Sequence, residues 1–172
     1  GDQFGLGLDV DGGLWAWGAN GSGELGLGST TSSHAPVHVQ EPDGVVFSEI
    51  AAGSTHALAV DSSQRIWAWG SNGSGRLGTG DTATRLAPTM LTEPSSVSFV
   101  DVSAGVSHSL ALASTGNVWG WGNSNTGQTG VGDTNVPLEV AIASSDPISS
   151  ISAGGQHSLA LTVNGVGWGW GY

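Results

Sequence analysis

The sequence contains no cysteine and no lysine, and three arginines face 14 acidic residues, so that the net charge is −11. Without cysteine there are no disulfides, no thiolate metal ligands and no cysteine nucleophile. A surface with so few cations repels phosphate groups, which disfavours nucleic acids and anionic membranes as partners. No run of 18 apolar residues offers a membrane-spanning helix. We therefore expect neither a nucleic acid nor a membrane as partner.

The scarcity of charge does not indicate disorder, because 38% of the residues are hydrophobic and eight are tryptophan. The opening stretch "GDQFGLGLDVDGG" lacks the basic start and the apolar core of a signal peptide. Richness in glycine, serine and threonine without lysine is slightly more typical of an extracellular bacterial protein. Composition alone leaves the location unknown.

An internal repeat dominates the sequence. A tryptophan pair with the pattern "WxWG" begins four times, at spacings of 52, 52 and 49 residues: Trp15, Trp67, Trp119 and Trp168. The last spacing is shorter because the loop after Asp133 is shorter than the loop after Asp81. A regular period near 50 predicts an array of equal structural units. The units are residues 1–52, which start in mid-blade, 53–104, 105–153 and the start of a fourth, 154–172.

Each unit predicts four short strands and no helix. In "HALAVD" (56–61) bulky side chains alternate with alanine, so the bulky ones share one face of a strand. "RIWAWG" (65–70) alternates likewise and places Trp67 and Trp69 together. Small residues on one sheet face permit close stacking of sheets as blades, the arrangement by which a β-propeller limits its exposed strand edges. The predicted fold is all-β, a propeller with blades of four antiparallel strands.

The chain starts and stops inside the repeat. Its opening "GDQF" corresponds to "GSTH" at 53–56, and its end follows the fourth tryptophan pair directly. This phase predicts 14 strands, the first two finishing one blade and the other twelve forming three complete blades. About 3.3 repeats make a partial ring. Unpaired strand edges at its ends favour association with other chains.

The repeated residues resemble a known family. The segment "AAGSTHALAVDSSQRIWAWGSNGSGRLGTGDTATRLAPTML" (51–91) is similar to a repeat of the regulator of chromosome condensation family. The similarity includes "AGxxHSLAL" at 104–112 and "NxxGxLGxGDT" at 72–82, and it extends over essentially the whole chain. Three departures are Phe4, in place of the histidine, Thr129, in place of the leucine of "GxLG", and Ser29, in place of the aspartate of "GDT".

The resemblance implies a seven-bladed propeller, a ring that needs roughly twice the material of this chain. Members of the family are mostly protein-binding platforms. One eukaryotic branch exchanges nucleotide on a small GTPase and docks on chromatin, and a bacterial secreted branch includes an inhibitor of β-lactamase. The loop residues that would bind a GTPase or a nucleosome match no position of this sequence, so the partner-binding residues are unknown.

The repeated histidines and tryptophans are predicted to build the blades. One histidine per unit cannot converge on a metal ion, so we expect each to hydrogen-bond to backbone in a neighbouring loop. The tryptophans could stack on sugars, yet all eight occupy the framework position, which favours packing between blades. The predicted structural core consists of Trp15, Trp17, His56, Trp67, Trp69, His108, Trp119, Trp121, His157, Trp168 and Trp170.

The other motifs predict no catalytic residue, no metal and no cofactor. His34 and His38 would lie about 13 Å apart on a strand, which disfavours a zinc pair. "DVDGG" at 9–13 lacks the remaining ligands of a calcium loop and predicts a hairpin turn. Asp81 and Asp133 of "GDT" are expected to cap a turn through side-chain to backbone hydrogen bonds.

Three functions remain. The first is a non-enzymatic platform or scaffold that binds a protein through variable loops such as 29–35 and 81–87. The second is a structural subunit that joins other copies of itself through open blade edges into a ring or a fibre. The third, a hydrolase or lyase, has no convergent set of carboxylates or histidines to support it. A secreted enzyme inhibitor and a carbohydrate-binding module are weaker alternatives.

Overall fold

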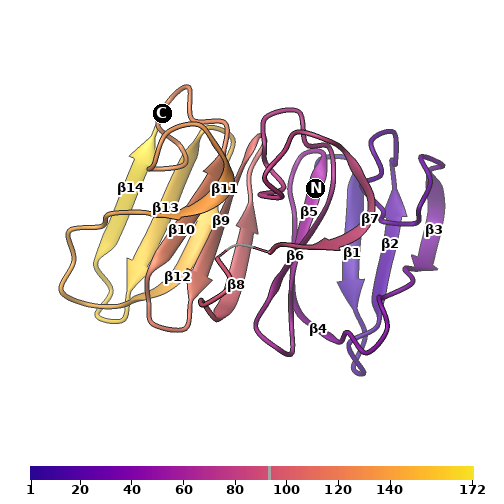
Figure 1. The fold of residues 1–172 in the computed structure, drawn as a ribbon, viewed down its shortest axis with the longest axis horizontal. Coiled ribbons are helices and arrows are strands. Elements are labelled where there is room, and N and C mark those ends of the chain that lie inside the picture. Colours follow the sequence, from indigo (N-terminus) through magenta and orange to yellow (C-terminus); the bar gives the residue numbers. More distant parts are fainter. Residues whose placement is uncertain (93) are drawn as a thin grey trace.

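The computed structural model describes residues 1–92 and 94–172. Four antiparallel sheets stand side by side like blades, from the indigo strands β1 and β2 at one end to the yellow strand β14 at the other (Figure 1). The all-β, propeller-like fold predicted from the alternating strands and the small residues is confirmed. The described residues include no helix with the length and apolar character needed to cross a membrane.

The first sheet contains β1 (Phe4–Leu8), β2 (Leu14–Gly18) and β3 (Ser33–His38). The second contains β4 (Phe47–Ala52), β5 (His56–Asp61), β6 (Ile66–Gly70) and β7 (Arg85–Met90). The third contains β8 (Phe99–Ala104), β9 (His108–Ala113), β10 (Val118–Gly122) and β11 (Thr134–Glu139). The fourth contains β12 (Ile148–Ala153), β13 (His157–Thr162) and β14 (Gly167–Gly171).

The described residues form 14 strands, as predicted, but the predicted phase is wrong by one strand. The four sheets hold three, four, four and three strands, instead of two strands followed by three complete blades. The tryptophan strand β6 is the third strand of its sheet, because β7 pairs back onto it with Trp67 opposite Met90 and Gly70 opposite Arg85. A repeat can be divided at any point of its period, and the alternation within a strand does not show which neighbour it pairs with.

Each sheet contains a tight hairpin that leads into the tryptophan strand. In the second sheet β5 and β6 pair with His56 opposite Gly70. The turn between them places Gln64 at φ 64°, and the matching turn of the third sheet has Gly116 at φ 86°. A left-handed residue is therefore part of this turn, and glycine adopts that conformation without strain.

The sheets contact one another chiefly through β4, β8 and β12, the first strands of the second, third and fourth sheets, here called the leading strands. β4 contacts β1, β8 contacts β4 and β5, and β12 contacts β8 and β9. The first sheet, β1 to β3, has no leading strand among the described residues. Each later sheet thus covers one face of the sheet before it.

Three apolar cores fill the spaces between the four sheets. In the core between the second and third sheets, Leu58 and Val60 of β5 lie with Ala111 of β9 and Trp121 of β10. One sheet supplies a bulky aliphatic face, and the next supplies small residues and indole rings. This arrangement buries both faces of an inner sheet, and in β5 and β9 every residue is buried.

Candidate binding loops and the contacts between blades

Three long loops follow the tryptophan strands β2, β6 and β10 at the same end of the sheets, spanning residues 19–32, 71–84 and 123–133. A buried asparagine organises each of the first two loops. The Oδ1 atom of Asn20 accepts a hydrogen bond from the N–H of Leu25 at 2.8 Å. The Oδ1 atom of Asn72 accepts one from the N–H of Leu77 at 3.0 Å. The two loops therefore share one internal frame, although their outer residues differ.

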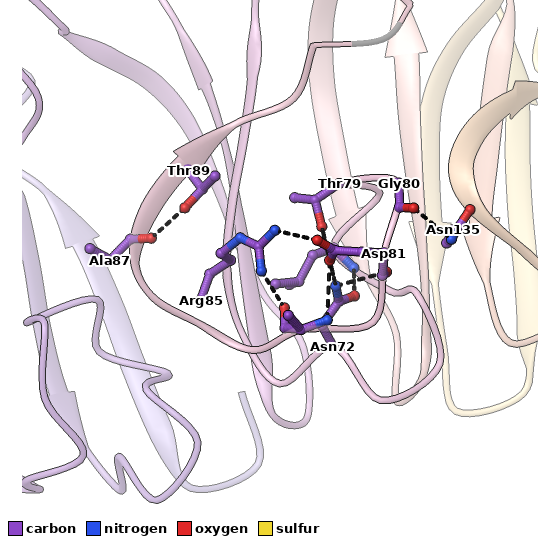
Figure 2. A network of polar contacts seen from close by, with 10 residues as sticks. Asn72, Thr79, Gly80, Asp81, Arg85, Ala87, Thr89 and Asn135 are labelled. Carbon is purple, nitrogen blue, oxygen red and sulfur yellow. Dashed lines mark hydrogen bonds and ion pairs between the residues drawn. The ribbon is translucent and has the colours of Figure 1, made fainter.

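The second of these loops is closed by a polar network around Asp81 (Figure 2). Arg85 donates to Oδ2 of Asp81 at 2.7 Å, and Asn72 donates from Nδ2 to the Asp81 carbonyl at 3.0 Å. Oδ1 of Asp81 accepts the N–H of Ala83 at 3.1 Å and the hydroxyl of Thr79 at 3.0 Å. The hydrogen bonds from Arg85 and Ala83 lower the pKa of Asp81. The prediction that Asp81 caps a turn is confirmed.

The loops rest on the outer strands of the next sheets. Gly80 donates to the carbonyl of Asn135 at 2.8 Å, and Nδ2 of Asn135 donates back to the Gly80 carbonyl at 2.9 Å (Figure 2). In the same way Gly28 donates to the carbonyl of Leu86 at 2.8 Å. The loop tips are thereby held in place, while residues 81–84 remain exposed.

A chain of hydrogen bonds joins the second sheet to the third. Nε2 of His56 lies 2.9 Å from the hydroxyl of Ser109 in β9. That hydroxyl donates to the backbone carbonyl of Arg76 at 2.7 Å, and Nε1 of Trp121 donates to the same carbonyl at 2.9 Å. Because Arg76 belongs to the loop 71–84, the third sheet holds both a strand and a loop of the second.

The same series of hydrogen bonds recurs between the third and fourth sheets. Nε2 of His108 lies 2.9 Å from the hydroxyl of Ser158 in β13. Ser158 donates to the carbonyl of Gln128 at 2.7 Å, and Nε1 of Trp170 donates to that carbonyl at 3.0 Å. The repetition shows that the contact belongs to the repeat and is not an accident of one interface.

Of these hydrogen bonds, the contact between the first and second sheets has only the one donated by the indole. Nε1 of Trp69 donates to the carbonyl of Glu24 at 2.8 Å. Phe4 stands at the histidine position and Ala57 at the serine position, and both lie in the apolar core between these sheets. The phenyl ring of Phe4 donates no hydrogen bond, and the residue opposite it, Ala57, has no hydroxyl to accept one.

Burial keeps the two inner histidines neutral. Ser109 gives its only proton to the Arg76 carbonyl, so it must accept the proton carried by Nε2 of His56. Burial first, and then the charges of Arg76 and His108, lower the pKa of His56 to about 3. Burial first, and then His157, lower the pKa of His108 to about 4. Both imidazoles are thus uncharged at neutral pH.

The prediction that each histidine hydrogen-bonds directly to backbone in a neighbouring loop is wrong for the two inner histidines. Each inner histidine bonds to a serine hydroxyl of the next sheet, and only that hydroxyl reaches a backbone carbonyl. The serines follow the histidine position of the next repeat directly, as Ser109 and Ser158. The sequence carried a signal for them, since His56 and His108 are each matched with serine one repeat later while Phe4 is matched with Ala57.

The eight tryptophans fall into different environments according to their neighbours. Trp69 and Trp121 are completely buried, whereas Trp15 and Trp17 are 36% and 38% exposed. Trp15 and Trp17 lie on the side of the first sheet that faces away from the second. The others are Trp67, which is buried, and Trp119, Trp168 and Trp170, which are half-buried.

A carboxylate that the sequence reasoning did not single out binds one indole. Oδ2 of Asp61 accepts hydrogen bonds from Nε1 of Trp67 and Nε of Arg65, both at 2.8 Å. Burial acts to raise the pKa of Asp61, but the hydrogen bonds from Trp67 and Arg65 outweigh it and the pKa is lowered. In the third sheet Ala113 occupies the matching position, and Nε1 of Trp119 is buried without a partner in the described residues.

The histidine–serine pairs are not built as nucleophilic sites. Ser109 and Ser158 are completely buried, and each hydroxyl donates to a carbonyl instead of to the imidazole that would activate it. In residues 1–92 and 94–172 no three His, Asp or Glu side chains gather so as to hold a metal ion. The arrangement locks neighbouring sheets together.

Comparison with known proteins gives the same repeat. The family model "Regulator of chromosome condensation (RCC1) repeat" matches residues 11–60, 63–112 and 115–161. The ultraviolet-B receptor UVR8 of Arabidopsis thaliana is 34% identical over 152 residues, which cover 87% of this chain and 34% of UVR8. The chain spans about a third or less of the length of the curated relatives that it matches.

Two solved propellers superpose on the chain. Human WBSCR16 matches with a TM-score of 0.88 and 26% identity over 99% of this chain and 45% of WBSCR16. Yeast RCC1 (Prp20), solved in complex with Kap60, matches with a TM-score of 0.84 and 24% identity over 100% of this chain and 42% of Prp20. The predicted partial propeller is confirmed, because the chain covers less than half of each of these propellers.

Proposed function

The chain belongs to the RCC1 repeat family, and on that premise we propose that it is a non-enzymatic protein-binding platform that contacts its partner with the three loops 19–32, 71–84 and 123–133. Its sheets are part of a larger RCC1-like propeller. The proposal concerns one end of this propeller, where all three loops lie.

The observation that supports this proposal is the contrast between the frame of the loops and their tips. Asn20 and Asn72 hold the same turn in two loops, while the exposed tips read "TTS" at 30–32 and "DTAT" at 81–84. A rigid frame that presents different exposed side chains is typical of binding loops on a scaffold, because the frame limits the entropy lost on binding.

The charges of the two ends of the sheets also favour the loop end. Two of the three arginines of the chain, Arg76 and Arg85, belong to it and offset part of the charge of its loop carboxylates, Glu24, Asp81 and Asp133. The hairpins and links at the opposite end carry four exposed or half-buried aspartates: Asp9, Asp11, Asp43 and Asp146. In a chain of net charge −11 the loop end is therefore the less negative of the two ends, and an acidic partner approaches it with less repulsion.

The relatives support a protein as the partner. Prp20 was solved with Kap60 bound to it, so a protein that contains this fold binds another protein. The identity of that partner is not carried over to this chain, because 24% identity indicates the fold alone. The proposed partner is a folded protein surface rather than a substrate, a nucleic acid or a membrane.

Two substitutions at the loop tips test the proposal. Thr30 and Thr82 are exposed. Thr30→Arg and Thr82→Arg place a large charged side chain in the proposed interface without touching the frame. The partner is first captured from the source organism with the full-length protein and identified by mass spectrometry, and its affinity is then measured by calorimetry. We expect each substitution to weaken binding about tenfold.

Ser62→Arg, in an exposed hairpin turn at the opposite end of the sheets, is the matched control and should leave the affinity unchanged. Melting temperatures equal to that of the unmodified protein show that the variants are folded. Binding that survives both loop substitutions, or that is lost with the control, contradicts the proposed surface.

A further inference from the structure

One aspartate of the second sheet accepts three N–H groups from its own hairpin. Oδ1 of Asp61 accepts the backbone N–H of Ser63 at 2.8 Å and that of Arg65 at 3.0 Å. Oδ2 of Asp61 accepts Nε1 of Trp67 at 2.8 Å. Two backbone donors and one indole donor thus converge on a single carboxylate. This set of two backbone N–H groups and one indole N–H is called the three-donor site below.

The first sheet forms the same three-donor site around Asp9. Oδ1 of Asp9 accepts the N–H of Asp11 at 3.0 Å and that of Gly13 at 2.8 Å. Oδ2 of Asp9 accepts Nε1 of Trp15 at 3.0 Å. The hydrogen bonds from Trp15, Gly13 and Asp11 lower the pKa of Asp9. The three donors therefore favour a charged carboxylate even in this exposed hairpin.

The third sheet has the same hairpin but carries Ala113 in place of the aspartate. The hairpin closes as in the first two sheets, since Ala113 donates to the carbonyl of Asn117 at 2.9 Å. Residues 1–92 and 94–172 supply no acceptor for the backbone N–H groups of Thr115 and Asn117 or for Nε1 of Trp119. The three donors are thus kept while the oxygen atoms that bind them elsewhere are missing from the side chain at 113.

A pocket of about 330 Å³ lies beside Ala113. The three residues that carry the donors, Thr115, Asn117 and Trp119, line it, and Glu139 lines it as well. Thr115 and Asn117 are exposed, so the pocket opens to the surface. Its volume exceeds that of an aspartate side chain, which leaves room for a carboxylate together with the group that carries it.

Glu139 opposes the binding of an anion in this pocket. Its Oε1 atom accepts Nδ2 of Asn117 at 2.8 Å, and its backbone pairs with that of Trp119. Histidine and methionine occupy the matching positions of the first two sheets, as His38 and Met90. Because like charges repel each other, we expect an anion to bind weakly and neutralisation of Glu139 to strengthen its binding.

We propose that the pocket beside Ala113 is a carboxylate-binding site, in which a carboxylate of another molecule replaces the aspartate of the first two sheets. One oxygen accepts the backbone N–H groups of Thr115 and Asn117, and the other accepts Nε1 of Trp119. The carboxylate belongs to a small organic acid or to an acidic side chain of a partner. The hairpin between β9 and β10 lies opposite the loops proposed above, so this inference goes beyond the proposed function.

Titration of the full chain with sodium acetate at constant ionic strength tests this inference. The indole N–H signals are followed in nitrogen–proton correlation NMR spectra, and Trp119→Phe identifies the signal of Trp119 by its loss. We expect acetate to shift this signal with a dissociation constant of about 1–10 mM. Acetamide, which has a similar shape but no charge, should leave it in place.

A second probe distinguishes the two sources of the carboxylate. It is aspartate with both its amino and its α-carboxyl group blocked, so that only the side chain carries a charge. Tighter binding of this probe than of acetate assigns the site to an acidic side chain of a partner. Tighter binding of acetate assigns it to a free organic acid.

Ala113→Asp is the matched control, because aspartate occupies this position in two other sheets. We expect it to shift the Trp119 signal without acetate and to abolish the response to acetate. Glu139→Gln should bind acetate about threefold more tightly. The proposal is overturned if the signal of the unmodified protein does not move in about 100 mM acetate, far above the expected dissociation constant. An equal shift with acetamide, or an undiminished response in Ala113→Asp, also overturns it.

Discussion

The same five residues, "HSLAL", occur in β9 at 108–112 and in β13 at 157–161, but their burial differs between the two strands. In β9 all five are buried. In β13 Ser158 and Ala160 are buried while Leu159 and Leu161 are about half exposed. The local sequence fixes the strand and its two faces, but only the next sheet decides whether the second face is core or surface.

From this difference we expect the interfaces between neighbouring sheets to contribute most of the stability of the array. In repeat proteins the total is close to a sum of repeat and nearest-neighbour contributions. A residue at a completed interface should therefore be worth far more than its equivalent at an end of the array. Substitutions made in pairs, at equivalent positions of two sheets, test this expectation.

The largest effect is expected for Trp69→Ala against Trp17→Ala. Trp69 is completely buried and donates to the Glu24 carbonyl, whereas Trp17 is 38% exposed. Loss of a buried indole should lower the free energy of unfolding by about 3–5 kcal/mol. The Trp17 variant should lose less than half of that. Urea denaturation followed by circular dichroism measures both, and equal losses would show that the end sheet packs like an inner one.

Leu110→Ala against Leu159→Ala compares the two copies of "HSLAL" directly. Leu110 is completely buried between the third and fourth sheets, and Leu159 is 50% exposed. We expect a loss of about 3 kcal/mol for Leu110 and under about 1 kcal/mol for Leu159. The same denaturation curves provide the test. A larger loss at Leu159 than at Leu110 contradicts the assignment of the two faces.

Acid should weaken the completed interfaces through their histidines. The pKa values of His56 and His108 are lowered to about 3 and about 4, below the value near 6.5 of an unfolded chain. The unfolded state then binds protons more readily, so stability that is present above pH 6.5 is lost as the pH falls. Between pH 7 and pH 5 each histidine should cost about 2 kcal/mol.

The double variant His108→Phe with Ser158→Ala copies the Phe4–Ala57 interface and sharpens this test. It should remove about 2 kcal/mol of the loss between pH 7 and pH 5, because one of the two buried imidazoles is gone. Unfolding free energies at both pH values, measured in the same buffer series, give the difference. An unchanged pH dependence would show that His108 does not carry the effect.

The smallest effect is expected for Asp61→Ala against Asp9→Ala. Asp61 is 1% exposed and accepts hydrogen bonds from Trp67 and Arg65, and its removal should cost about 1–3 kcal/mol. Asp9 makes the matching bond to Nε1 of Trp15 at 3.0 Å but is exposed, so its loss should be smaller. Thermal unfolding of the two variants side by side ranks them, and the reverse order contradicts the comparison.

Much of this structure could be predicted from the repeat. The alternation in "HALAVD" and "RIWAWG" predicted strands with one small and one bulky face, and β5 and β6 confirm it. The spacing of the tryptophans predicted equivalent sheets. The division into blades was wrong because Met90 and Arg85 of β7 pair with the strand before them, a long-range choice that no single strand encodes.

The contacts between blades were harder to predict for a similar reason. His56 and Ser109 are 53 residues apart, and only the packing of two sheets brings them within 2.9 Å. The carbonyl that completes the contact, on Arg76, does not depend on the side chain at that position, so the sequence carries no sign of it. The joint change of Phe4 and Ala57 was visible and would have indicated the pairing.

The absence of cysteine permits the most direct test of the central claim, that the neighbouring sheet and not the local sequence decides burial. Leu110→Cys and Leu159→Cys each place a single thiol at the same position of "HSLAL", and their rates of reaction with a maleimide report exposure. We expect Leu159→Cys to react at least ~100-fold faster, the factor that an opening free energy of about 3 kcal/mol gives. Equal rates for the two thiols would contradict the account.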